Sequence, residues 1–258
     1  MERGGNLLSP AVASALQWWA DAGVDVMVDE APRDWLRPAS NTRSVPAKAG
    51  IQAASPDRAD ADWAPASAGA REDNLPDQLE LFRAYLREHD QLPFASPSAP
   101  RVCPSGDPAS GLMMMTAMPA SEDCAAGTLL SGEAGRLFDR MLAAIGRDRE
   151  SIYLASLSCF RSPDGRLAGA GAERCATLAR HHIGLAAPKA LLLFGDQPAA
   201  ALLGMKMAQA RGRWHEVATH AGPIRAIVTI PPDLLLKQPS AKAYAWADLQ
   251  LLMQGLQP

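Results

Sequence analysis

The feature that most constrains this chain is the alternation, from residue 111 onward, of short apolar runs with longer amphipathic segments. The apolar runs are typical of strands buried on both faces, and the amphipathic segments are typical of helices. The predicted strands cover residues 112–118, 152–157, 189–194 and 224–230, and the predicted helices cover 132–145, 175–185, a segment beginning at Asp196, and 240–253. This order predicts an α/β three-layer sandwich with a central, mostly parallel four-stranded sheet.

Residues 1–37 predict a helical leader, because a Ser-Pro pair typical of a helix start precedes an apolar stretch. The leader contains Trp18, Trp19 and Trp35, which is half of the six Trp in the chain. Trp is favoured as an anchor at protein interfaces. Two interpretations stay open: the leader binds a partner protein, or it packs against the chain's own domain.

The rest of the chain divides by composition. Residues 38–75 are rich in Ala, Pro, Ser, Asp and Arg and predict a disordered linker. Residues 76–110 predict a helix and a connector, and residues 111–258 predict the folded domain. Residues 1–100 carry nine basic and fifteen acidic side chains, whereas residues 101–258 carry sixteen basic and thirteen acidic ones. The domain is only mildly basic, so we expect any contact with nucleic acid to be local.

The cysteines and the apolar runs exclude several classes of protein. Cys103, Cys124, Cys159 and Cys175 form no C-x-x-C pair, so we expect neither a zinc site nor a thioredoxin-like motif, and no bound metal. No apolar run approaches the roughly 20 residues that cross a membrane. We therefore expect a cytoplasmic protein with reduced thiols and no membrane partner.

Ligands of such α/β folds bind at the carboxyl ends of the strands, and the segments there resemble one family. The blocks are "SGEAGRLFDRMLAAIG" (131–146), "YLASLSCFRSPDG" (153–165), "APKALLLFGDQPAAALLG" (187–204), "RGRW" (211–214) and "PPDLLLKQPSAKAYAWADL" (231–249). In this order they resemble the family 4 uracil-DNA glycosylases, including their alphaproteobacterial relatives. The resemblance implies a uracil-DNA glycosylase-like fold over 111–258.

The same resemblance implies that the catalytic groups are replaced. A uracil-DNA glycosylase flips the nucleotide, stacks an aromatic ring on the base and reads its edge with an amide, and it uses a carboxylate and an imidazole for the chemistry. The carboxylate position falls at Ala117, the stacking Phe at Leu130, the imidazole at Pro231 and the base-reading Asn near Ser156. We therefore expect a catalytically degenerate member, a pseudoenzyme that is not a DNA glycosylase.

Two alternatives at these positions stay open. Glu122 and Asp123 follow one turn downstream and can substitute for the missing carboxylate, or they form a solvated loop pair. Ser156 can hydrogen-bond a base, or it caps the end of its strand.

Family 4 enzymes hold an iron–sulfur cluster, which needs four thiolates. Cys175 falls at a ligand position, but the upstream C-x-x-C pair is missing. Phe160 falls at the third ligand position, or Cys159 does with a slip of one residue. The sequence therefore predicts no cluster and no other cofactor.

The resemblance yields three hypotheses for function. The first is an inactive accessory or interaction subunit in DNA replication or repair, and the layout resembles the psi subunit of the DNA polymerase III clamp loader. That resemblance implies a replication or repair partner such as the clamp loader, bound through the leader, and a nucleoid-associated location. The second is an active, divergent glycosylase for uracil or another deaminated base. The third is a passive binder of single-stranded or damaged DNA, with Arg211, Arg213 and His215 of the DNA-side loop touching phosphates; the alternative for these residues is an ordinary basic surface.

Overall fold

The computed structural model describes residues 75–256. The predicted leader, with Trp18, Trp19 and Trp35, and residues 38–74 of the predicted linker lie outside the described residues. Within them, no helix is long and apolar enough to cross a membrane.

One mixed sheet of six strands forms the centre of the structure, in the order β1-β3-β2-β4-β6-β5. The four inner strands are parallel and comprise β2 (Leu112–Thr116), β3 (Tyr153–Ser156), β4 (Ala190–Phe194) and β6 (Gly222–Thr229). The antiparallel edge strands are β1 (Ser105–Gly106) and β5 (His215–Thr219). The predicted α/β class and mostly parallel sheet are confirmed, but the prediction of four strands is wrong, because it omitted both edges.

The omitted strands carry no apolar run. Strand β1 has two residues, both exposed. Strand β5 buries only Val217 of its five residues, so its sequence does not resemble the inner strands. Edge strands of this kind are defined by pairing with a neighbour, and β5 pairs with β6 along its whole length.

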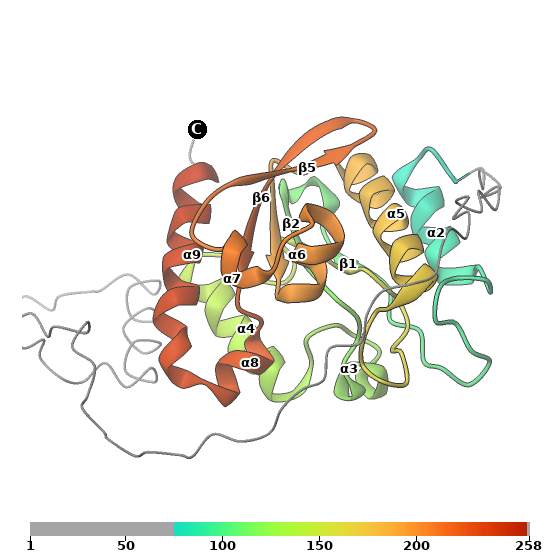
Figure 1. Cartoon of the computed structure of the whole chain (residues 1–258), viewed down its shortest axis with the longest axis horizontal. Helices are drawn as coiled ribbons and strands as arrows, with labels where there is room; N and C mark the ends of the chain where they lie inside the picture. Colours follow the sequence, from blue (N-terminus) through green and yellow to red (C-terminus); the bar gives the residue numbers. More distant parts are fainter. Residues whose placement is uncertain (1–74, 257–258) are drawn as a thin grey trace, which may run out of the picture. The chain divides into compact units, whose positions relative to one another are not determined.

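Helices cover both faces of the sheet, as the layers in Figure 1 show. One face carries α4 (Gly132–Ala144), α8 (Pro232–Lys237) and α9 (Lys242–Leu256), and the other carries α5 (Gly169–Ala186) and α6 (Asp196–Leu203). Shorter or peripheral elements are α2 (Leu79–Glu88), α3 (Ser121–Ala126), α7 (Met207–Ala210) and the 3₁₀ turns Pro108–Ser110 and Pro239–Ala241.

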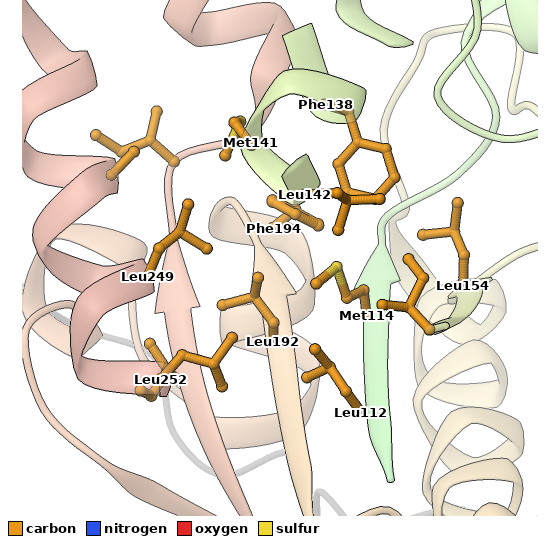
Figure 2. Close-up of a cluster of buried hydrophobic side chains, with 14 of the residues drawn as sticks. Leu112, Met114, Phe138, Met141, Leu142, Leu154, Leu192, Phe194, Leu249 and Leu252 are labelled. Carbon is orange, nitrogen blue, oxygen red and sulfur yellow. The ribbon is translucent and has the colours of Figure 1, made fainter. Parts of the chain in front are cut away.

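The core forms on both faces because side chains alternate along each buried strand. Leu112 and Met114 of β2 point toward α4 and α9, where they join the apolar cluster shown in Figure 2. Met113 and Met115 point to the opposite face and pack in a second cluster with residues of α5 and α6. All four side chains are almost completely buried. The inner strands β2 and β4 are therefore closed to solvent on both faces, and a ligand can reach them only at their ends.

Helix α2 packs against α5, as Figure 1 shows. Its Phe82 is completely buried in a third apolar cluster with Leu86, Leu92, Cys159, Phe160 and Leu178. The segment 76–110, predicted as a helix and connector, thus contributes core to the same compact unit as the sheet.

A buried His–Tyr pair beneath α2 makes stability depend on pH. Nε2 of His182 lies 2.8 Å from the Tyr153 hydroxyl. Burial lowers the pKa of His182 from 6.5 to about 3, and the nearby Arg83 and His181 lower it further. Between pH 6.5 and 3, His182 is protonated in the unfolded chain but neutral in the folded one. The contribution of His182 to the free energy of unfolding is therefore fully present above pH 6.5 and is lost as the pH falls toward 3.

We expect the free energy of unfolding to fall by up to about 1.4 kcal/mol per pH unit through this group alone. Urea unfolding of the wild type and of His182→Gln, compared between neutral and mildly acidic pH, measures this contribution as the difference between the two slopes. Equal slopes would show that His182 does not titrate differently in the folded and unfolded states.

Candidate functional site

A cleft of about 570 Å³ opens at the carboxyl ends of the parallel strands. It brings together three of the predicted positions, since Ala117 after β2, Leu130 before α4 and Pro231 after β6 all line it. Within residues 75–256, its lining includes no histidine and one aromatic side chain, Phe194, which is 3% exposed and packs edge-on against Phe138. The partly exposed surface of the cleft at the three predicted positions is therefore formed by Ala117, Leu130 and Pro231.

Ser156 does not join this cleft. The residue is buried at the end of β3, and its hydroxyl donates a 2.7 Å hydrogen bond to the Ser158 carbonyl. The Ser156 hydroxyl therefore caps the end of its own strand, which is one of the two interpretations given by the sequence.

Leu130 has a left-handed backbone with φ of 53°, which is unusual for a residue with a side chain. The Arg149 guanidinium holds this turn by donating to the carbonyls of Leu129 and Leu130, at 2.9 and 2.6 Å. Gly135 of α4 lies directly against the turn, because a Cβ there would lie 2.0 Å from the Leu130 carbonyl oxygen. The position of Leu130 in the cleft therefore depends on a close approach of two backbone segments.

We expect Gly135→Ala to destabilise the protein by about 1–3 kcal/mol, because the added methyl group has no space. The sign is informative, since Ala in place of Gly inside a helix otherwise stabilises by about 1 kcal/mol. Thermal or urea unfolding measures the change, and a variant more stable than the wild type would show that the turn relaxes freely.

Glu122 and Asp123 lie in the first turn of α3 and both line the cleft. Asp123 is buried, and its carboxylate accepts hydrogen bonds from the backbone N–H groups of Ala120 (2.9 Å) and Ser131 (2.6 Å). The Glu122 side chain is exposed, with its carboxylate against Gly132 at the start of α4. The interpretation of a solvated loop pair is wrong for Asp123, because this carboxylate joins two segments of the loop.

Four helices start at the cleft, and each carries an acidic side chain in its first turn. Glu122 and Asp123 belong to α3, Glu133 to α4, Asp196 to α6 and Asp233 to α8. A helix N-terminus attracts anions, and in α/β proteins it often binds phosphate. Here each of these first turns instead carries negative charge of the chain's own, which disfavours a bound anion. Among the described residues that line the cleft, the only cations are Arg161 and Lys237, against five carboxylates, so this lining is acidic.

Arg211, Arg213 and His215, the predicted phosphate contacts, lie outside the cleft lining and bond within the chain. Nε and Nη2 of Arg211 each lie 2.8 Å from the same oxygen of Asp248, a carboxylate that also accepts from Thr229. Burial raises the pKa of Asp248, and its bonds to Thr229 and Arg211 oppose the rise. This network engages two of the three guanidinium nitrogens of Arg211 inside the chain.

The other two residues bond to backbone carbonyls. Nη2 of Arg213, which is exposed, donates to the Gln209 carbonyl at 3.1 Å, and the His215 ring lies 2.7 Å from the Ala210 carbonyl. The neighbouring Arg225 guanidinium stacks over the Trp214 ring at 4.1 Å from its centre.

The cysteines do not fit the iron–sulfur cluster of family 4. Phe160 and Cys159, either of which the resemblance places at one ligand position, are both buried in the apolar cluster under α2. A hydrogen bond from Cys159 lowers the pKa of Cys103 to about 6, whereas that bond and burial raise the pKa of Cys159. Cys175 faces the other apolar cluster, where burial raises its pKa to about 11. Among residues 75–256, no group of three or more His, Cys, Asp or Glu side chains is placed to hold a metal.

The comparison with known proteins agrees with this fold. Residues 103–250 match the family model described as the Uracil DNA glycosylase superfamily. A relative named Type-4 uracil-DNA glycosylase, from Pyrobaculum aerophilum, is 21% identical over 184 residues, which cover 69% of this chain and 94% of the relative.

Proposed function

This chain belongs to the Uracil DNA glycosylase superfamily, and from that premise we propose that it serves DNA replication or repair as a binding subunit that does not excise bases. One observation carries the proposal. The strand-end cleft is lined by Ala117, Leu130 and Pro231, the residues that the resemblance places at the family's carboxylate, Phe and imidazole positions.

The physical argument concerns charge that develops during excision. A carboxylate that positions water and an imidazole that stabilises the departing base each contribute roughly 10²–10⁴-fold to a rate. The methyl group of Ala117 and the ring of Pro231 provide neither a proton acceptor nor a donor. The acidic side chains at the helix starts also repel the phosphates of a substrate strand. The missing proton donor and acceptor and the repulsion of phosphates both support a role in binding a partner protein and not in excising a base.

The partner in this proposal is a replication protein such as the clamp loader, bound through the leader of residues 1–37. Trp18, Trp19 and Trp35 are the anchors, because large aromatic side chains dominate many protein interfaces. The leader lies outside the described residues, so this step is carried by the sequence alone.

A pull-down with the full chain as bait and purified clamp loader as prey tests the partner. We expect retention by the wild type and a loss of at least about tenfold in affinity for the variant with all three Trp changed to Ala. A variant with Trp214→Ala, in the folded domain, is the control for general loss of Trp. Absence of binding, or equal binding by the triple variant, would contradict the proposal.

A second candidate is an active, divergent glycosylase. It is favoured by the relative from Pyrobaculum aerophilum, whose length is almost fully covered and whose name states that activity. Glu122 is the carboxylate that such an enzyme would use, because it is exposed and lines the cleft whereas Asp123 is bonded to two backbone N–H groups. If the wild type excises a base, Glu122→Gln would lower the rate by roughly 10²–10⁴-fold, whereas Glu133→Gln at the same cleft would preserve it.

A further inference from the structure

The acidic side chains of the cleft are unevenly engaged. Asp196 accepts a 2.8 Å hydrogen bond from the backbone N–H of Met207, and Asp123 accepts two such bonds. Glu133 pairs with Arg136 at 3.5 Å on an exposed surface. Glu122 and Asp233 are exposed and accept no hydrogen bond from the described residues. The carboxylates of Glu122, in the helix after β2, and of Asp233, in the helix after β6, therefore remain able to bind a cationic group.

A buried hydroxyl in the same cleft also lacks a partner. Thr116 follows Leu112 and Met114 on the α4 face of β2, lines the cleft and is 8% exposed. Its Oγ1 has no hydrogen-bond partner among the described residues. Leaving a buried polar atom unpaired costs stability, and an N–H donor from a bound group would satisfy it.

The remaining lining suits the stem of a long basic side chain. Leu130, Pro231 and the 38%-exposed Leu236 provide apolar surface beside the carboxylates. Lys and Arg side chains pack their methylene groups on such surface while the charged end reaches an acidic group. A volume of about 570 Å³ accommodates one or two side chains of this size with part of their backbone.

We propose that this cleft binds a Lys- or Arg-bearing peptide segment of a partner protein. The inference rests on the proposed function, because it names the kind of partner that the former base-excision site accepts. Charge complementarity carries it: the carboxylates at the helix starts oppose a phosphate backbone and attract an ammonium or guanidinium group. The unpaired Thr116 hydroxyl provides an acceptor inside the same cleft.

Fluorescence anisotropy with the full chain tests this inference. The probes are a labelled decapeptide of alternating Lys or Arg and Ser, its counterpart with Glu at the basic positions, and a labelled oligothymidylate of similar length. We expect the basic peptide alone to bind saturably, with affinity that weakens as salt is added.

Variants locate the binding. We expect Glu122→Gln and Asp233→Asn each to weaken the basic peptide by about two- to fivefold, and the double variant to weaken it further. Glu216→Gln on the exposed edge strand β5 removes the same charge outside the cleft and should leave the affinity unchanged. Unfolding midpoints equal to the wild type confirm that the variants fold.

Three results would overturn the inference: no binding of the basic peptide, binding that the two cleft variants do not weaken, or oligothymidylate binding more tightly than the peptide. Excision of a base by the wild type would instead overturn the proposed function. The two failures are distinguishable, because the titrations report no chemistry and the formation of abasic sites does not depend on the peptide.

Discussion

The Phe82→Ala variant is expected to lose about 3–5 kcal/mol of the free energy of unfolding. Phe82 is completely buried between α2 and α5, where its ring lies 5.0 Å from that of His181 and 5.2 Å from that of His182. Its removal leaves a cavity that the neighbouring helix cannot fill without moving. Urea unfolding followed by circular dichroism measures the loss in one cooperative transition.

The matched control is Leu81→Ala on the same helix. Leu81 is 53% exposed, so we expect a change of less than about 1 kcal/mol. If Phe82→Ala is as mild as this control, the segment 76–110 is an appendage and not part of the domain core.

Asp123→Ala is the second large effect, with an expected loss of about 3–5 kcal/mol. The buried carboxylate accepts hydrogen bonds from the N–H groups of Ala120 and Ser131, and its removal leaves both donors unpaired. Hydrogen bonds to a charged group each contribute about 1.5–3 kcal/mol. Urea unfolding measures the change.

Glu122→Ala removes the neighbouring carboxylate and is the control, with a change of less than about 1 kcal/mol because that side chain is exposed. A loss for Asp123→Ala no larger than that of the control would mean that the two hydrogen bonds of the Asp123 carboxylate do not hold this loop together.

The fold could be predicted from the sequence because its inner strands are apolar on both faces. The runs Leu112–Thr116 and Ala190–Phe194 are buried at every position and lie where the alternation placed them. The edge strand β5 buries only one of its five residues and has neither an apolar run nor a polar–apolar alternation, so its identity as a strand depends on pairing with β6. Pairing of this kind is a tertiary property that a local pattern does not contain.

The candidate site was predictable only in part. The ordered blocks located Ala117, Leu130 and Pro231 on separate loops, and the structure brings all three to one cleft. The closure of Ser156 on Ser158 could not be read from the sequence, because it depends on the path of the chain after β3.

The acidic character of the cleft was missed for a different reason. Each carboxylate has an ordinary explanation in its own helix, as a favourable charge in the first turn. The carboxylates lie together only because α3, α4, α6 and α8 all begin at the same end of the sheet. The available signal was an acidic residue shortly after three of the four predicted strands, such as Asp196 after β4 and Asp233 after β6.

The central claim is that this cleft no longer removes bases, and a single-turnover measurement tests it most directly. The wild-type protein, in large excess over single-stranded DNA that contains one uracil, is sampled over hours for abasic sites. Our account predicts the same yield as DNA incubated with heat-unfolded protein. Abasic sites that accumulate with the folded wild type, and that Glu122→Gln abolishes, would contradict it.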